Sequence, residues 1–407
     1  MNRFRCVAGA LLAVTLPCGA QTGAAQGSGN ANANAFNPAI SLILSGRYTR
    51  TSRDPAGATI AGFALPADAE VGAGPRGFSL GESELGVAAS IDPWWRGAAT
   101  FALRGDNTGS VEEAFVQTTA LGNGVSAKAG RTFANIGYLN PQHAHAWDFV
   151  DNPLAYQALL GTQLGNDGVQ LTWIAPLDRY LEVGAELGRA TGFPGGDITG
   201  NGASLHALSL RTGGDVGDSH DWRAGVSLLG TRADGQRLAA TDAAGRAVTN
   251  AFSGRSRVWI AEGVWKWAPQ GNATRTSLKL QGEVLRGTRD GRLAYDVAGV
   301  DSADRYRAVQ SGWYVQGVYQ FMPRWRVGLR TERLDAGTPD YGLNAAALST
   351  PAAHPSKHSL MVDWSPSEFS RIRAQLARDR SRGDGRVDNQ LSLQYQMSLG
   401  AHGAHGY

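Results

Sequence analysis

The sequence predicts an all-β protein, a transmembrane antiparallel β-barrel of about 16 strands, and three observations support this prediction. From Pro38 onward, stretches of about ten residues alternate between apolar and polar positions, the length that a tilted strand needs to cross a bilayer. The segments between these stretches alternate between short and long. No segment contains 18 consecutive apolar residues, which excludes helical membrane spans.

The N-terminus has the features of a secretory signal peptide. Two arginines precede an apolar run from Val7 to Leu16, and small residues follow it. The run is too short to span a bilayer, and this order of charged, apolar and small residues is typical of an export signal. We therefore expect a signal peptide at residues 1–20, with cleavage as late as residue 25, and a flexible, polar lead-in at residues 21–37.

The composition is compatible with export to the cell outer membrane. Both cysteines, Cys6 and Cys18, lie in the signal peptide, so the mature chain would have no disulfide. The mean hydropathy is slightly negative, but strands with one face toward lipid and the other toward water average to a neutral value. We therefore predict that residues 38–407 form an outer-membrane β-barrel.

Sixteen segments have the alternation of strands that cross a membrane. In the last of them, Leu393, Tyr395 and Met397 share one parity, and polar residues occupy the other. One face would therefore contact lipid and the other water. The predicted strands are residues 39–50, 78–91, 95–104, 111–120, 125–133, 168–175, 180–190, 203–212, 221–231, 256–267, 274–286, 311–321, 324–334, 357–364, 369–378 and 389–400.

The connections predict which end of the barrel faces the periplasm. Short periplasmic turns and long external loops are the layout of outer-membrane barrels, and aromatic residues gather beside the short connections, where an interfacial girdle belongs. The predicted short turns are residues 92–94, 121–124, 176–179, 213–220, 268–273, 322–323 and 365–368. The predicted long loops include residues 51–77, 134–167, 232–255, 287–310 and 335–356.

The segment from Ala134 to Asp167 is the one long interior stretch that reads as neither a strand nor a tight turn. It contains Tyr138, Trp147, Phe149 and Tyr156, and this many aromatic residues argue against disorder. Long connections in ordered proteins usually carry function. We predict that residues 134–167 are the third external loop and fold inward to form the constriction of a pore.

The strand count, the loop alternation and the long third loop resemble those of the general porins of Gram-negative outer membranes. Four segments also look like a family of uncharacterised proteobacterial outer-membrane proteins, often labelled porin-like or TonB-dependent receptors. These segments are Phe36 to Leu44, Arg76 to Pro93, Val111 to Leu121 and Gly137 to Asp151. The second label fits poorly, because a TonB-dependent transporter has 22 strands and a plug. Porins also end on an outward aromatic residue, for which Tyr407 has the right parity.

Charges on the lumen side would set the selectivity of such a channel. By parity the inward acids and bases nearly balance, so the sequence predicts no strong selectivity. The predicted inward acids are Glu82, Glu84, Glu113, Glu182, Glu186, Glu262, Glu283 and Glu332. The predicted inward bases are Arg47, Arg96, Arg104, Lys128, Arg223, Lys279, Arg326, Arg330 and Arg373.

The resemblance to general porins implies a constriction in which acids on the loop oppose a basic wall. Here Asp148 and Asp151 are the candidate loop acids. A further group of acids would collect on one wall near the constriction: Glu82, Glu84, and the adjacent Glu112 and Glu113. The basic residues expected to face the two aspartates are Arg47, Arg96, Arg104 and Arg131.

Histidines in the same loop suggest a metal site. His143 and His145 lie close in sequence to Asp148, and imidazole and carboxylate groups suit zinc, copper or nickel. The spacing is not that of a closed structural zinc site. A weakly bound zinc ion is therefore the one cofactor that the sequence leaves open, and histidines that only fix the shape of the loop are the alternative.

These features predict a porin-like channel for passive diffusion of small hydrophilic solutes or ions. A substrate-specific or metal-linked uptake protein is the first alternative, and a non-conducting structural or adhesive barrel is the second. No nucleophile motif accompanies the histidines, so we predict no enzyme activity. The expected partners are outer-membrane lipid and the solute, with a homotrimer left open and no nucleic acid, because the positive charge is not clustered.

Overall fold

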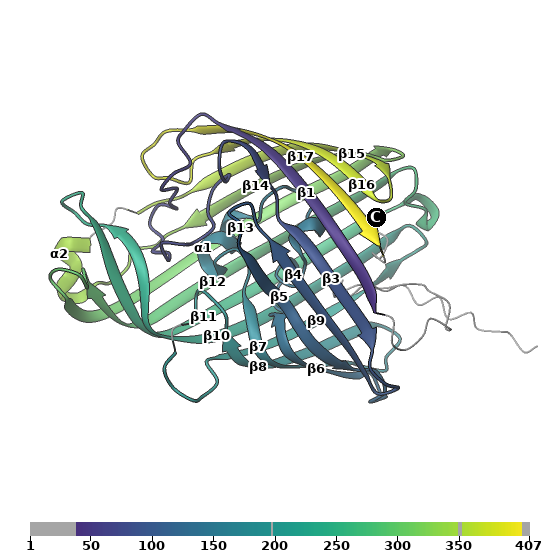
Figure 1. Cartoon of the computed structure of the whole chain (residues 1–407), viewed down its shortest axis with the longest axis horizontal. Helices are drawn as coiled ribbons and strands as arrows, with labels where there is room; N and C mark the ends of the chain where they lie inside the picture. The colour runs from purple at the N-terminus through teal and green to yellow at the C-terminus, as the bar shows by residue number, and fades with distance from the viewer. Residues whose placement is uncertain (1–37, 197, 349–351, 401–407) are drawn as a thin grey trace, which may run out of the picture.

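The computed structural model describes residues 38–196, 198–348 and 352–400, and in these residues the chain forms a closed antiparallel barrel of 16 strands, as predicted. β1 pairs with β17 on one side and with β2 and β3 on the other, so the sheet has no free edge. β2 and β3 are two parts of one crossing that is interrupted at Gly81 and Glu82. Figure 1 shows β1 and β17 side by side.

The strand bounds agree with the predicted segments to within a few residues at most ends. The strands are β1 (Ala39–Thr51), β2 (Gly77–Leu80), β3 (Ser83–Ser90), β4 (Trp95–Leu103), β5 (Gly109–Thr118), β6 (Val125–Phe133), β7 (Gly165–Ile174), β8 (Tyr180–Ala190), β9 (Leu205–Val216), β10 (His220–Thr241), β11 (Ala247–Trp267), β12 (Ser277–Tyr295), β13 (Ser302–Met322), β14 (Trp325–Asp335), β15 (Ser356–Ser367), β16 (Ser370–Asp379) and β17 (Asp388–Gly400).

The described helices are short. They are η1 (Ala144–Ala146), α1 (Leu154–Leu160), η2 (Pro269–Gly271), η3 (Gly342–Asn344) and α2 (Ala345–Leu348). None of the helices in the described part of the chain is long and apolar enough to cross a membrane.

The two faces of the strands differ as the alternation predicts. On β17, Leu393 and Tyr395 are exposed on the outer face, whereas Gln396 and Ser398 are buried toward the barrel interior. The same division places large apolar residues on the outer face of most strands, such as Val226, Leu280 and Leu329. An outer band of this kind matches the lipid-facing surface of a membrane barrel.

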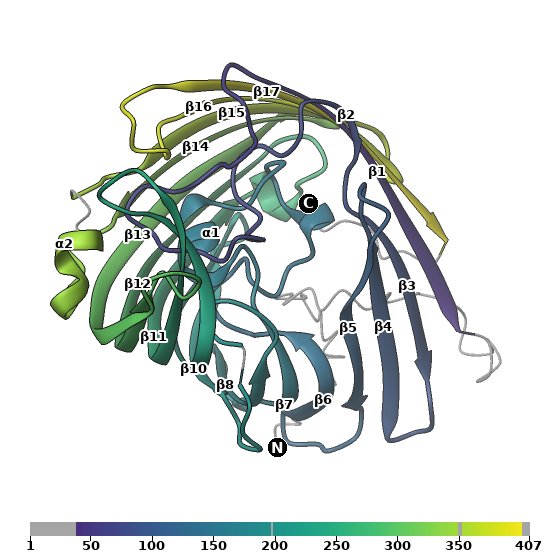
Figure 2. The same ribbon diagram turned by 60° about the vertical axis from the view of Figure 1, so that its left-hand side comes forward.

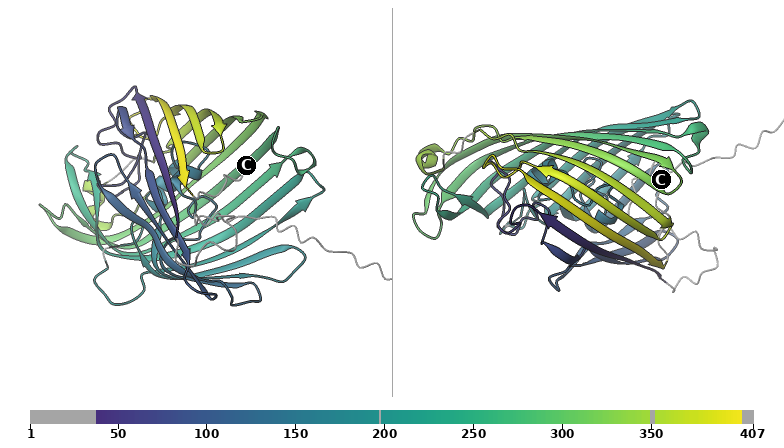
Figure 3. Two further views of the ribbon diagram at one scale, coloured as in Figure 1. Left: turned by 45° about the vertical axis from the view of Figure 1, so that its right-hand side comes forward. Right: turned by 90° about the horizontal axis from the view of Figure 1, so that it is seen from above.

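Two of the predicted external loops, residues 232–255 and 287–310, are wrong, because β10 to β13 continue through most of both segments. The chain turns only at residues 242–246 and 296–301. Figures 1 and 3 show these four strands extending well beyond their neighbours.

The extended parts of β10 to β13 reverse the polarity of the membrane-spanning parts. Leu238, Phe252 and Leu293 are buried on the inner face of these extensions. Eight exposed arginines occupy the outer face: Arg232, Arg237, Arg255, Arg257, Arg286, Arg292, Arg305 and Arg307. This charged outer face made the segments look like loops in the sequence.

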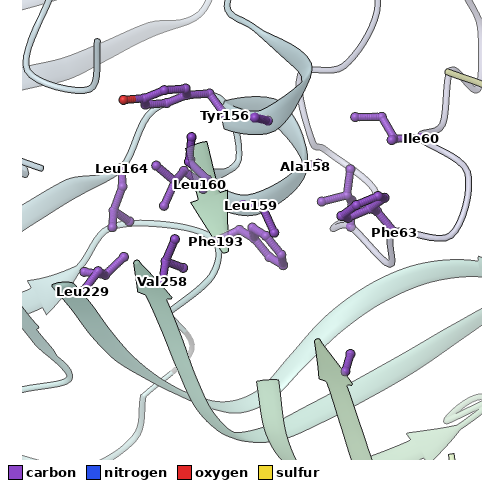
Figure 4. Close-up of a cluster of buried hydrophobic side chains, with 14 of the residues drawn as sticks. Ile60, Phe63, Tyr156, Ala158, Leu159, Leu160, Leu164, Phe193, Leu229 and Val258 are labelled. Atoms are coloured by element: carbon purple, nitrogen blue, oxygen red, sulfur yellow. The ribbon is translucent and has the colours of Figure 1, made fainter. Parts of the chain in front are cut away.

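The principal apolar core lies inside the barrel. Ile60 and Phe63, from the loop between β1 and β2, join residues of α1 and apolar side chains of the inner wall. Figure 4 shows Leu159 beside Phe193, and Leu164 near Leu229 and Val258. The interior of the barrel is therefore partly filled by two of its own external loops.

Three predictions fall outside the described residues. The signal peptide at residues 1–20, the lead-in at residues 21–37 and the outward position of Tyr407 have no counterpart in the described part of the chain. They remain predictions.

Candidate functional site

The third external loop lies inside the barrel, where its prediction placed it. It begins after β6 and ends at Leu164, three residues earlier than predicted, because β7 starts at Gly165. All seven residues of α1 are buried, and Figure 2 shows α1 surrounded by the strands. The segment of residues 134–164 is called the inner loop below.

Close approach fixes the position of α1 against the wall. A Cβ atom on Gly312 of β13 would lie 3.0 Å from the Cβ of Ala155, so the missing side chain leaves room for the helix. The helix ends at Gly161, whose φ of 62° is in the left-handed region that favours glycine. These two glycines let a short helix pack directly on the sheet.

Wall carboxylates satisfy backbone amides of the inner loop. Glu283 of β12 accepts hydrogen bonds from the backbone N–H of Tyr138, at 2.7 Å, and from the hydroxyl of Tyr156, at 2.8 Å. Glu332 of β14 accepts one from the N–H of Leu154, at 2.5 Å. Burial and the Glu283 charge raise the pKa of Tyr156 well above its usual value. Buried amides need such partners, and the sheet supplies them here.

Asp148 and Asp151 bind basic residues of β12, β14 and β15. Asp148 forms ion pairs with Lys279 and, at 3.2 Å, with Arg326. Asp151 forms ion pairs with Lys357 and, at 2.7 Å, with Arg330. Both carboxylates are buried or nearly so, and the paired cations compensate their loss of hydration.

These neighbours also determine the acidity of the two aspartates. Burial alone would raise the pKa of Asp148, but Lys279 and Arg326 outweigh burial and hold this pKa well below its usual range. Lys357 and Arg330 likewise outweigh burial and hold the pKa of Asp151 well below its usual range. Both side chains are therefore charged at neutral pH.

The basic cluster expected to face the two aspartates is largely wrong. Arg96 hydrogen-bonds to Gln117 at 2.7 Å and interacts electrostatically with Glu113, and Arg104 lies 3.9 Å from Glu82, so both belong to the acidic side. Arg131 pairs with Asp167 at 2.7 Å, and Asp167 shares its parity on β7 with lipid-facing residues. Only Arg47 of β1 interacts with Asp151, and it does so electrostatically.

Two further arginines, Arg371 and Arg373, hold the inner loop. The sequence analysis did not identify Arg371, and it placed Arg373 on the inner face without assigning it to the constriction. Arg371 donates a hydrogen bond to the carbonyl of His145 at 2.6 Å, and Arg373 donates one to the carbonyl of Trp147 at 2.9 Å. Both have inward parity on β16, and Lys357 has it on β15, so the alternation could have identified them. The basic wall is defined here as Lys279, Arg326, Arg330, Lys357, Arg371, Arg373 and Arg47.

The predicted wall acids lie together on β3, on β5 and at the break before β3. Glu84 of β3 and Glu113 of β5 are buried, and Glu112 lies beside them. Glu82, at the break between β2 and β3, is partly exposed and lies next to Arg104. The acidic wall is defined here as Glu82, Glu84, Glu112 and Glu113.

The histidines of the inner loop bind this acidic wall. His143 lies within 3.0 Å of Glu112 through Nδ1 and of Glu113 through Nε2. Nδ1 of His145 lies 2.7 Å from Glu84. Burial lowers the pKa of His143, but Glu84 and the hydrogen bonds to its neighbours outweigh burial and raise this pKa well above its ordinary value.

Asp148 is not part of this group, so the predicted set of His143, His145 and Asp148 is wrong in its carboxylate. Asp148 is engaged by Lys279 and Arg326 instead. The residues whose ligand atoms come within 4.8 Å of one another are Glu84, Glu112 and His143.

Comparison with known proteins places the chain in a family. No protein-family model matches it. A protein of Aquifex aeolicus (strain VF5), described as an uncharacterized protein, is 30% identical over 398 residues, which cover 92% of this chain and 80% of the relative. The chain belongs to the same family as this protein.

Solved structures show which fold this family has. OmpT of Vibrio cholerae, as a loop L8 deletion mutant, is 13% identical with a TM-score of 0.54, over 90% of this chain and 100% of the other. The anion-selective porin from Comamonas acidovorans is 10% identical with a TM-score of 0.53, over 89% and 99%. DcaP of Acinetobacter baumannii is 13% identical with a TM-score of 0.51, over 89% and 97%. The fold is therefore that of outer-membrane β-barrels.

Proposed function

We propose that the protein is an outer-membrane channel for passive diffusion of small hydrophilic solutes or ions, with the inner loop as its constriction. The observation that supports this proposal is the partial exposure of charges beside the loop. The side chains of Lys279 and Arg326 face the interior and are 25% and 21% exposed, so solvent reaches the level of Asp148. Barrels of about this strand number enclose aqueous channels.

The two charged walls support an electric field across the constriction. The acidic wall and the basic wall lie on different strands, with the inner loop bonded to both. Opposed charges in a low-dielectric cleft orient polar solutes and concentrate ions. Because acids and bases nearly balance, we expect weak ion selectivity rather than strong selectivity.

The names of similar structures agree with this proposal. DcaP is called an outer-membrane channel, and the Comamonas protein is called an anion-selective porin. On the basis of these names we propose that this protein is also a channel and has no enzyme activity. OmpT of Vibrio cholerae is described in a trimer form, and we propose a homotrimer here, which native mass spectrometry of the detergent-solubilised protein can test.

The decisive experiment is single-channel recording of the refolded protein in a planar bilayer. We expect steady openings in KCl and a small reversal potential in a KCl gradient. Arg47→Gln removes an inward charge whose Nε has no hydrogen-bond partner, so it should shift the reversal potential toward cation selectivity with little effect on the fold. Arg50→Gln is the matched control, because Arg50 lies on the outer face of the same strand.

Equal reversal potentials for wild-type protein and the Arg47→Gln variant would contradict the assignment of Arg47 to the ion path. Flux of one solute that saturates, without general conductance, would favour a substrate-specific uptake protein instead.

The apolar core inside the barrel favours a second candidate function, a non-conducting structural or adhesive barrel. Leu159, Leu160 and Phe63 occupy interior space that a wide channel would leave to water. A variant in which residues 154–160 are replaced by glycine and serine separates the two candidates. Conductance in this variant but not in the wild-type protein would support the non-conducting barrel.

A further inference from the structure

We propose that the inner loop and the barrel wall form a binding site for a divalent metal ion of the zinc class, with His143 Nδ1, Glu84 and Glu112 as its ligands. The ligands come from three separate segments: β3, β5 and the inner loop. The site does not require that the barrel conducts, so it stands or falls independently of the proposed channel.

The positions of the ligand atoms fit such an ion. Nδ1 of His143 lies 3.0 Å from Oε2 of Glu112 and 3.3 Å from Oε2 of Glu84. Ligand atoms at about 2.0–2.1 Å from zinc in a tetrahedral site lie about 3.3 Å from one another. These two separations are therefore close to the edges of a zinc coordination tetrahedron, and the ligand atoms of Glu84 and Glu112 lie within 4.8 Å of each other. Small side-chain movements would bring the three atoms to three corners of the tetrahedron.

The second ring nitrogen of His143 supplies an independent indication. Its Nε2 lies 3.0 Å from Oε2 of Glu113, while the ring packs edge-on against Phe133 at 5.1 Å between centroids. A histidine that binds a metal typically donates its other N–H to a carboxylate, which fixes the tautomer and the orientation of the ring. Glu113 holds Nε2 in this way and leaves Nδ1 directed at the other two carboxylates.

The charge balance of the cluster also favours a bound cation. Three carboxylates, those of Glu84, Glu112 and Glu113, surround one imidazole ring, and their side chains are at most 8% exposed. Ionised carboxylates only accept hydrogen bonds. Buried negative charge needs compensation. A protonated His143 offsets one of these charges in the metal-free protein, and a dication that replaces this proton between Glu84 and Glu112 would offset two.

His145 orients one of the ligands. Its Nδ1 lies 2.7 Å from Oε1 of Glu84, the oxygen that does not contact His143. The two imidazole rings stack at 5.7 Å between centroids. Glu84 is therefore held from one side while its Oε2 points toward the proposed metal position, so His145 is a positioning residue.

The donor set indicates the class of ion. One imidazole nitrogen with two carboxylate oxygens suits zinc and related transition metals. Magnesium and calcium prefer oxygen ligands alone. A bound ion would link the first part of the inner loop to β3 and β5.

Zinc titration of the full-length protein, refolded in detergent without a histidine tag and followed by calorimetry, tests the proposal. We expect one zinc site in the wild-type protein that excess magnesium does not displace. Glu112→Gln removes a ligand and Glu113→Gln removes the carboxylate that holds the ring, and each should weaken this site at least ~10-fold. Both variants keep the shape of the side chain, and circular dichroism checks that the barrel has folded.

His354→Ala is the matched control, because His354 also lies beside one carboxylate, with its Nδ1 3.7 Å from Asp335, but outside the cluster. Its zinc affinity should equal that of the wild-type protein. His402 and His405 of the C-terminal tail are present in every variant, so the differences report only the proposed site. Equal zinc affinity in the wild-type, Glu112→Gln and Glu113→Gln proteins would overturn the proposal, and so would the absence of zinc binding.

Discussion

Asp151 shows how a single buried charge holds the inner loop in place. Its carboxylate accepts hydrogen bonds from Arg330 at 2.7 Å and from Gln375 at 3.0 Å, and it also pairs with Lys357. The side chains of Lys357 and Arg330 are 1% exposed. Neither cation can turn to solvent, so both rely on buried carboxylates. Asp151 pairs with both cations, and Glu332 also pairs with Arg330, at 3.1 Å.

Replacing Asp151 by asparagine should therefore loosen the inner loop strongly. Removing one partner of a buried ion pair costs about 3–5 kcal/mol, because the remaining charge stays buried without compensation. Hydrogen exchange of the peptide amides in residues 154–160, followed by mass spectrometry, measures the opening of the loop. Asp167→Asn is the control, because the exposed pair with Arg131 should contribute at most about 1 kcal/mol. Equal exchange in the two variants would contradict this role of Asp151.

The Asp151 ion pairs should contribute to the stability of the loop over a defined pH range. A carboxyl group whose pKa is lowered by folding stabilises the structure above its unfolded pKa, about 3.9 for aspartate, and this stabilisation is lost as the pH falls through the folded pKa. Because Lys357 and Arg330 hold the pKa of Asp151 below its usual range, the difference in loop-opening free energy between the wild-type and Asp151→Asn proteins should stay constant from pH 8 to about 5. This difference should decrease only below about pH 4. A midpoint between pH 5 and 7 in this difference, from exchange data corrected for the intrinsic rate, would refute this expectation.

At this scale the sequence predicted which side chains face inward but not which of them meet. Alternation placed Glu84, Glu113, Lys279, Arg326 and Arg330 on the inner face, and the structure confirms this. The partners of Asp148 and Asp151 were wrong, because ion pairs between a loop and a distant strand depend on where the loop lies. Periodicity along a strand contains no information on that position.

The individual strands reverse their polarity where the barrel leaves its apolar band. On β12, Val284 is an exposed apolar residue and Arg286 is the next outward residue. On β11 the change lies between Trp259 and Arg257. These positions mark the external edge of the lipid-facing surface on this side of the barrel.

An arginine introduced on the two sides of this edge should have unequal effects. Val284→Arg places a charge on the lipid-facing surface beside its external edge and should destabilise the barrel by up to about 1 kcal/mol, less than the cost of about 2–4 kcal/mol for a site at the bilayer midplane. Ala303→Arg is the control, because Ala303 is exposed on the outer face of the extension of β13, among other arginines. Urea unfolding in lipid vesicles compares the two variants. A destabilisation by Ala303→Arg as large as that by Val284→Arg would place the edge of the lipid-facing surface elsewhere.

The strands could be predicted from the sequence wherever contact with lipid requires apolar and polar residues to alternate. All 16 crossings were identified from alternating residues, and so were the short periplasmic turns. The extensions of β10 to β13 were not predicted. A membrane strand is expected to have an apolar outer face, so segments with charged outer residues were interpreted as polar loops. The alternation was present, as Leu238 and Phe252 show, but with the opposite parity.

On the scale of the whole molecule, the barrel is lined differently at its two ends. Toward the periplasmic side the interior contains Asp148 with its partners Lys279 and Arg326, whereas toward the external side it contains the apolar core of α1 and the first external loop. The sequence predicted that the inner loop enters the barrel, because its aromatic and aliphatic residues need burial. It did not predict that Ile60 and Phe63 of another loop would share the same core, since contacts between two loops leave no periodic signal.

The eight outer arginines of β10 to β13 also bear on how the barrel reaches its final position. An external hairpin must pass through the hydrocarbon layer before it can emerge on the far side, and each arginine at the bilayer midplane costs about 2–4 kcal/mol. The two hairpins, β10 with β11 and β12 with β13, each carry four of these arginines across. Their translocation is therefore a large energetic barrier to assembly, which a thinned bilayer or an insertion machinery that shields charge would lower.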